Sequence, residues 1–151
     1  MKLSFFNTPN SEISIFFNVS QSVGRNGQNS NPEDILLVQF LLKKMAETAP
    51  PSSAAARERK AIMRKVPLSG NIDQATIDGI IAVQESMKVT LPKTIVDGRV
   101  SVAKDYLYGG GYWSIVALNG FVRRHNARVW PRLQDFSDCP GLLKSKVQMM
   151  L

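Results

Sequence analysis

Two kinds of spacing between apolar residues separate the expected strands from the expected helices. Apolar residues occupy every second position from residue 13 to residue 19, as Ile13, Ile15, Phe17 and Val19. This period of two predicts a strand over about 12–20 with one buried face. Residues 3–6 are expected to pair with it in a hairpin, which should pack on the helices because a lone hairpin is marginally stable in water.

Three longer segments carry apolar residues at helical spacing and predict the core helices. Their expected bounds are about 32–48, 73–88 and 112–128. A last short helix is expected to begin at Pro140 and to dock through Leu142, Leu143, Val147 and Met150. The pattern therefore predicts a mainly α fold, a three-helix bundle with an N-terminal β-hairpin and a C-terminal helical extension.

The expected helix boundaries coincide with residues that favour helix ends. Asn31 and Asp73 are typical N-caps, because their side chains accept hydrogen bonds from free backbone amides. Pro32 suits the first helical turn, where no amide donor is needed. The third core helix is expected to end or bend at Pro131, because proline cannot donate the helical hydrogen bond.

The length of 151 residues suits a single domain. We place its core at residues 22–120 and treat residues 121–151 as a C-terminal extension. The alanine-rich, basic segment at 52–65 favours a surface helix, so residues 50–65 are interpreted as an insertion between core helices.

The chain has a net charge of +7, and the excess of basic residues begins after residue 56. Such a charge favours an anionic partner, among them nucleic acids, wall polymers, membrane surfaces and acidic proteins. No apolar run is long enough to span a membrane. Polar residues follow the short apolar start, so we expect no conventional signal peptide. Synthesis is expected in the cytoplasm, and contact with a periplasm or cell wall would require an unconventional export route.

Several short motifs resemble those of peptidoglycan-binding-like domains. They are DI at 34–35 with VQFLL at 38–42, GNIDQAT at 70–76 with IIAVQ at 80–84, VDGRV at 96–100, and LN at 118–119. The match covers about residues 22–120, and Val83 departs from it because the family usually has phenylalanine there. Within these motifs, Thr76 can make a second capping bond, and Gln39 and Gln84 can tie the helices to one another or to loops through their amides.

The resemblance implies a non-catalytic module that binds bacterial cell-wall peptidoglycan, a glycan or its peptide. The expected ligand contacts are Arg25, Asn26, Asn29, Arg99, Tyr108, Tyr112 and Trp113. The alternative is a structural or adaptor protein of a phage or a contractile, type VI-like secretion system. In that case residues beyond Phe121 and the basic insertion would bind an effector, tail or secretion-system protein.

Two clusters leave a functional and a structural interpretation open. The aromatic residues Tyr106, Tyr108, Tyr112 and Trp113 could stack on sugar rings or could seal the bundle. A basic stripe is expected to hold at least three of the arginines Arg123, Arg124, Arg128 and Arg132. It is either a solvated face or a surface where Arg123, Arg124 and Arg128 bind an acidic protein or an anionic polymer. No helix-turn-helix pattern surrounds them, so nucleic-acid recognition is not expected.

Catalytic arrangements have little support in the sequence. His125 is the only histidine and Cys139 the only cysteine, which excludes zinc sites built from several such ligands. A Cys139–His125 dyad or an Asp135–Asp138 carboxylate pair would be the alternatives, but structural roles are favoured for all four residues. We therefore expect no enzyme, no cofactor and no metal site.

Overall fold

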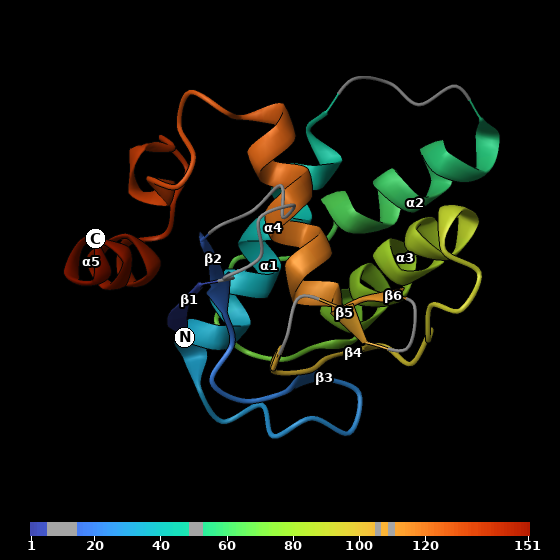
Figure 1. The fold of residues 1–151 in the computed structure, drawn as a ribbon, viewed down its shortest axis with the longest axis horizontal. Helices are drawn as coiled ribbons and strands as arrows, with labels where there is room; N and C mark the ends of the chain where they lie inside the picture. The colour runs from blue at the N-terminus through green and yellow to red at the C-terminus, as the bar shows by residue number, and fades with distance from the viewer. Residues whose placement is uncertain (6–14, 49–52, 105–106, 109–110) are drawn as a thin grey trace.

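The computed structural model describes residues 1–5, 15–48, 53–104, 107–108 and 111–151, and its architecture is mainly helical (Figure 1). The helices are α1 Pro32–Ala46, α2 Ala54–Arg64, α3 Gln74–Thr90, α4 Ser114–His125 and α5 Gly141–Met150, with a short 3-10 helix η1 at Leu133–Asp135. The strands form antiparallel pairs: β1 Lys2–Phe5 with β2 Ile15–Asn18, β3 Val23–Gly24 with β4 Arg99–Val100, and β5 Leu107–Tyr108 with β6 Gly111–Tyr112. The predicted mainly α fold is confirmed.

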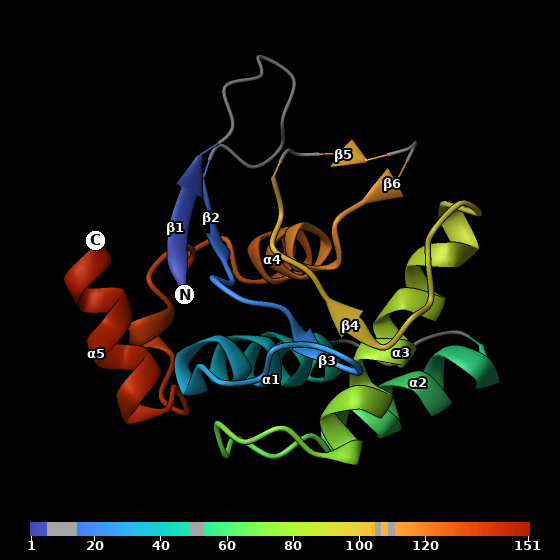
Figure 2. The same ribbon diagram turned by 90° about the horizontal axis from the view of Figure 1, so that it is seen from below.

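Helix α1 lies at the centre of the molecule and contacts the other four helices. Most of its residues are buried, as expected for a helix that is apolar on most of its circumference. Figures 1 and 2 show α5 and the β1–β2 hairpin on one side of the molecule and α2 and α3 on the other. Each described helix is too short or too polar to cross a lipid bilayer.

The predicted N-caps are present. Asn31 Oδ1 accepts a hydrogen bond from the amide of Glu33 at 3.0 Å, and Pro32 opens α1. Asp73 Oδ1 accepts bonds from the Thr76 amide and the Thr76 hydroxyl, each at 2.7 Å. The second capping bond expected at Thr76 therefore forms, and it fixes the start of α3.

The N-terminal hairpin forms as predicted, but the prediction of one buried face on its second strand is wrong. Phe16, Phe17 and Asn18 in β2 are all buried. The Asn119 side chain bonds the Phe17 amide at 2.7 Å and the Phe17 carbonyl at 2.9 Å. The Asn18 side chain donates to the Ala103 carbonyl at 2.8 Å and accepts from the Ala103 backbone amide at 3.1 Å. These side-chain amides satisfy polar groups at the strand, so β2 can be covered on both faces.

The end of α4 also differs from the prediction. The helix stops at His125, six residues before Pro131. Asn126 leaves the helical conformation, with φ −136° and ψ 42°, and its side chain donates to the Val122 carbonyl at 3.1 Å. An asparagine side chain that competes for helical carbonyls favours such an end, so Pro131 is not the residue that ends α4.

The basic segment contributes a helix to the core. Ser53 caps α2 by accepting a hydrogen bond from the Ala56 amide at 3.1 Å. Met63 is fully buried where α2 packs against α1 and α3. Lys60 extends to the segment just after α1 and donates to the Thr48 carbonyl at 3.0 Å. Most other α2 side chains are exposed, in line with the expected surface helix.

Residues 121–151 pack into the same core as the rest of the chain. Leu133, Leu143 and Val147 are fully buried, whereas Leu142 is 48% exposed and does not dock as predicted. Lys44 of α1, only 5% exposed, donates to Asp138 Oδ2 at 2.6 Å and to Glu47 Oε2 at 2.8 Å. Its ammonium group lies 4.8 Å from the Phe136 ring centroid and 5.2 Å from that of Phe40. The ion pair between buried Lys44 and Asp138 thus holds the C-terminal extension, residues 121–151, against α1.

Candidate functional site

Two buried glutamines hold the loops beside α1 and α3, as the sequence predicts. Gln39 Oε1 accepts from the amides of Ser69 and Gly70, each at 3.0 Å, and its Nε2 donates to the Asn71 carbonyl and the Thr76 hydroxyl. Gly70 has a φ of +73°, which glycine adopts without strain. The first glutamine therefore fixes the turn that leads into α3.

Gln84 does the same for the turn before β4. Its Oε1 accepts from the amides of Asp97 at 3.1 Å and Gly98 at 2.9 Å. Its Nε2 donates to the Arg99 carbonyl at 3.0 Å and to Ser114 Oγ at 3.2 Å. One buried side chain thus links the strand that carries Arg99 to the first residue of α4. This link sets the distance between Arg99 and Trp113.

The loop that contains Arg25, Asn26 and Asn29 packs against that turn. Asn29 Oδ1 accepts from the Gly24 amide at 2.8 Å, and its Nδ2 donates to the carbonyls of Gly24 and Gly27. The Arg25 amide donates to the Gly98 carbonyl at 2.9 Å. The Asn29 side chain closes the loop, while the Arg25 and Asn26 side chains are exposed to solvent.

Arg99 and Trp113 line one hollow, which we call the Arg99–Trp113 hollow. Its volume is about 270 Å³, and its lining is Gln84, Ile95, Asp97, Arg99, Ser101, Trp113 and Ser114. Asp97 Oδ2 lies 3.9 Å from Nη2 of Arg99, whose side chain is 40% exposed. Nε of Arg99 is buried and has no hydrogen-bond acceptor among the described residues. The hollow therefore combines a cation, hydroxyl groups and an indole ring.

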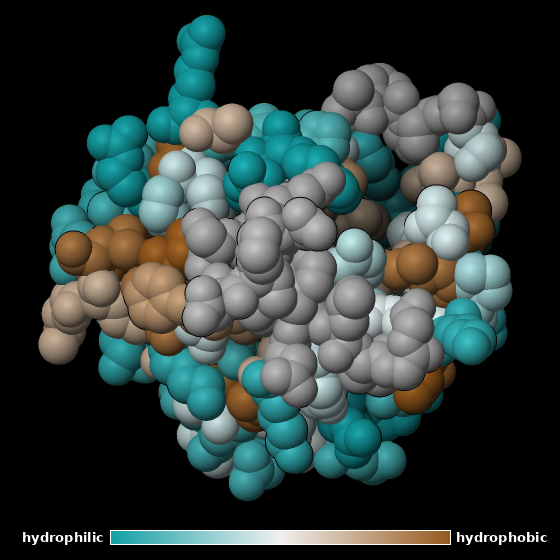
Figure 3. All heavy atoms as spheres, in the orientation of Figure 1, coloured by the Kyte–Doolittle hydropathy of each residue, from teal (hydrophilic) through white to brown (hydrophobic). Residues whose placement is uncertain are grey.

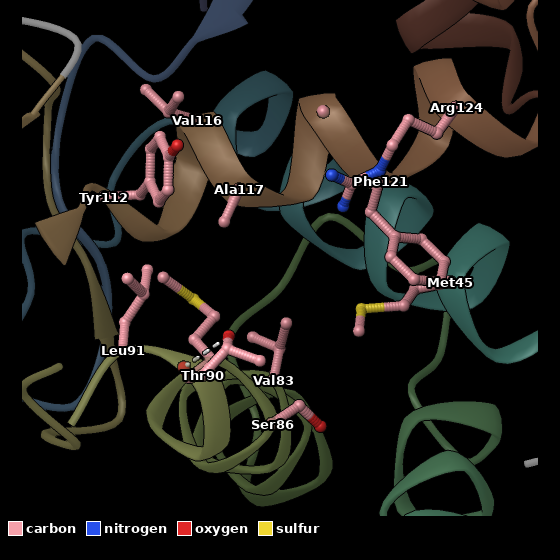
Figure 4. A pocket seen from close by; sticks show the side chains of 12 residues that line it. Met45, Val83, Ser86, Thr90, Leu91, Tyr112, Val116, Ala117, Phe121 and Arg124 are labelled. Atoms are coloured by element: carbon pink, nitrogen blue, oxygen red, sulfur yellow. Dashed lines mark hydrogen bonds between the residues drawn. The ribbon is translucent and has the colours of Figure 1, made fainter.

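Tyr112, the neighbour of Trp113, lines a different depression. This α3–α4 cleft has a volume of about 330 Å³ and also includes Phe121 and Arg124 of α4. Figure 4 shows α4 above the cleft, α3 below it and Met45 of α1 at one end. The expected aromatic cluster is thus divided between two sites. Tyr106 and the side chain of Tyr108 lie outside the described part of the chain.

The expected basic stripe is also divided. Arg124 lines the α3–α4 cleft, and Arg123 is half-buried in the same helical turn. Arg128 is exposed beyond the end of α4, where its carbonyl accepts a bond from Arg132. These arginines therefore do not share a single helical face.

The residues considered for catalysis bind separate partners. Asp135 pairs with Arg132 at 3.2 Å, and Asp138 pairs with the buried Lys44. His125 is exposed and lies against the Phe121 ring, with 4.4 Å between the ring centroids. Burial raises the pKa of the Cys139 thiol to about 11, and the Asp138 carboxylate adds to this shift. A thiol with that pKa is protonated near neutral pH, which disfavours a role as nucleophile.

Asp97, Ser101 and Ser114 belong to the hollow but were not among the residues expected to bind a ligand. Asp97 stands in the VDGRV motif at 96–100 but is not among the expected ligand contacts, and the two serines stand outside any motif. Their meeting depends on Gln84, which brings the β4 strand to the start of α4. Such a long-range contact leaves no local pattern in the sequence.

No family model matches this sequence, and neither a curated protein nor a solved structure is significantly similar to it.

Proposed function

We propose that this protein is a non-catalytic module that binds bacterial cell-wall peptidoglycan through the Arg99–Trp113 hollow. The observation that carries the proposal is the meeting of Arg99 and Trp113, both expected ligand contacts, at one depression lined by polar groups. An indole face offers a broad apolar surface for a sugar ring. A guanidinium group matches the carboxylates of a wall peptide.

The surroundings of Arg99 support an anionic ligand group. Its side chain lines the hollow and is 40% exposed, so the guanidinium group can pair with a ligand carboxylate there. The Nε atom of the same group is buried and lacks an acceptor within the described residues, so hydrogen bonds to those residues do not saturate the guanidinium group. The opposing Asp97 carboxylate accepts from the Gln84 amide at 3.0 Å and from the Arg99 backbone amide at 2.9 Å. Asp97 therefore has hydrogen-bond donors of its own, one on α3 and one within the turn.

Retention on purified sacculi tests this function with a matched pair of variants. Arg99→Gln removes the cation of the hollow, and we expect the apparent affinity to fall about tenfold, the effect of one charge-assisted hydrogen bond. Arg25→Gln removes an exposed arginine of the adjoining loop that does not line the hollow, so we expect retention within about twofold of the wild type.

Equal effects of the two substitutions would indicate attraction by net charge alone. Unchanged retention of Arg99→Gln would exclude the hollow as the binding site. We expect both variants to keep the fold, because the Arg25 side chain is exposed and that of Arg99 is 40% exposed. Their circular dichroism spectra serve as the check on folding.

A second function, an adaptor in a phage particle or contractile secretion system, is favoured by the outer face of α5. Leu142 is 48% exposed and Met149 is 82% exposed. Figure 3 shows apolar surface gathered at the side of the molecule where α5 lies. An apolar surface of this kind fits a protein partner better than a glycan.

Leu142→Glu with Met149→Glu tests the adaptor function without disturbing the core. We expect both substitutions to abolish co-purification of a stoichiometric partner. Deletion of residues 121–151 is unsuitable for this test, since it would remove the buried side chains of Val122, Leu133, Leu143 and Val147. A partner that stays bound to the double variant would contradict this surface.

A further inference from the structure

The α3–α4 cleft has the size and lining of a small-ligand site. Its volume of about 330 Å³ lies at the lower end of the usual range for such sites. The apolar part of its lining is Met45, Val83, Met87, Leu91, Val116, Ala117 and Phe121. Figure 4 shows the Phe121 side chain directed from α4 toward Met45, and Leu91 and Thr90 at the opposite end beneath Tyr112. The two methionines give the cleft an adaptable wall.

The α3–α4 cleft has few polar side chains, and they differ in charge. Arg124 is the one charged side chain among the described residues that line it. The Thr90 hydroxyl donates to the Met87 carbonyl of its own helix at 3.4 Å. Glu85, on the same helix as Thr90, does not line the cleft. Within the described part of the chain, the cleft therefore joins an apolar lining to one cationic side chain.

This combination selects one class of ligand. A polyanion would need several cations, and a partner helix would need a longer groove for anchors three, four and seven residues apart. Peptidoglycan is too polar for a lining of this composition. We propose that the α3–α4 cleft binds a small amphiphile with an alkyl or acyl body and one anionic head, the head lying at Arg124. This site is separate from the Arg99–Trp113 hollow and does not depend on its function.

Calorimetric titration with decanoate, below the concentration at which it forms micelles, tests the charge requirement. Decanoate should bind the wild-type protein about tenfold more tightly than decanol, because only the carboxylate can pair with Arg124. Arg124→Gln should remove that difference. Arg123→Gln, which changes an arginine in the same helical turn outside the cleft, should leave it intact. Equal affinity for decanoate and decanol, or equal effects of the two substitutions, would overturn the proposal.

Methyl NMR of the wild-type protein tests the location without any variant. The methyl resonances of Met45 and Met87 should shift on addition of decanoate, whereas Met63, buried between α2 and its neighbours, should not respond.

A variant that fills the cleft tests the same location independently. Ala117→Phe should abolish the binding of decanoate. Shifts confined to other methyl groups, no detectable binding, or full binding by a folded Ala117→Phe variant would contradict the assignment.

Discussion

Gln84 connects the fold to the candidate site more directly than any other residue of the hollow. Its amide holds the turn at Asp97 and Gly98 and also reaches the Arg99 carbonyl and Ser114. These bonds lie between groups far apart in the sequence and away from bulk solvent. The side chain is therefore structural, and the hollow depends on it.

Gln84→Leu should lower the free energy of unfolding by about 3 kcal/mol, because two backbone amides lose their buried acceptor. It should also weaken retention on sacculi, since Arg99 and Trp113 lose their fixed separation. Gln74→Leu is the control, as this exposed glutamine of the same helix donates to the Asp78 side chain at 2.8 Å and its side chain has no other bond to the described residues. Urea unfolding measures both variants, and equal stabilities would show that the Gln84 bonds contribute nothing.

Cys139 should react slowly with iodoacetamide near neutral pH. With a pKa of about 11, roughly one thiol in a thousand is ionised at pH 8, and only the thiolate attacks. The rate should rise about tenfold per pH unit from pH 8 to pH 10 and reach half of its maximum near pH 11. For an unperturbed cysteine the rate reaches half of its maximum near pH 8.5. A half-maximal rate below about pH 9 in the folded protein would refute the raised pKa.

Whether the contacts of a residue can be predicted from the sequence depends on how far along the chain its partners lie. Asp73 and Thr76 interact within one helical turn, and the sequence predicts their capping bonds. Lys44 and Asn119 act across the chain, on Asp138 and on Phe17 respectively. Nothing in the local pattern distinguishes Lys44 from an ordinary exposed lysine, so its burial could not be predicted.

At the scale of elements, the local signals locate the helices well and the short strands poorly. Caps and apolar spacing predict α1 and α3 to within two residues at each end. The sequence predicts no strand at the positions of β3 and β4, because the pairing of these two-residue strands depends on a contact between Val23 and Val100. The helices are determined by neighbouring residues, whereas these strands are determined by tertiary contacts.

The docking of η1 and α5 on α1 rests on the ion pair between Lys44 and Asp138 and on the apolar contacts beneath it. Asp138→Asn should lower the free energy of unfolding by about 2 kcal/mol, because the buried ammonium group then keeps only the Glu47 carboxylate. Asp135→Asn, at an exposed pair with Arg132, should change it by less than about 0.5 kcal/mol. Chemical denaturation compares the two, and similar losses would contradict the special role of Lys44.

At the scale of the whole molecule, one core joins the hairpin, the five α-helices of the described residues and the C-terminal segment. The sequence predicts the fold class, the N-terminal hairpin and the order of the helices, but it treats residues 121–151 as an addition to a smaller bundle. Burial of Leu133, Leu143 and Val147 in the shared core makes them part of it instead. Each such side chain contributes about 1.5–3 kcal/mol, a large part of the stability of a small domain.

Two depressions with different chemistry flank the junction of β6 and α4. Tyr112 belongs to the apolar α3–α4 cleft, and Trp113 belongs to the polar Arg99–Trp113 hollow. The chain contains only one other tryptophan, Trp130, whose ring packs against Phe17 with 5.5 Å between the ring centroids. A spectroscopic signal from Trp113 therefore monitors the Arg99–Trp113 hollow, and a signal from Trp130 monitors the packing against Phe17.

The most direct test of the proposed function is the ¹H–¹⁵N NMR signal of the tryptophan indole groups during titration with soluble peptidoglycan fragments. We expect the Trp113 signal to shift in a saturable manner while the Trp130 signal stays in place, and Arg99→Gln should weaken the response about tenfold. A Trp113 signal that does not move at saturating fragment concentrations would contradict peptidoglycan binding at the hollow.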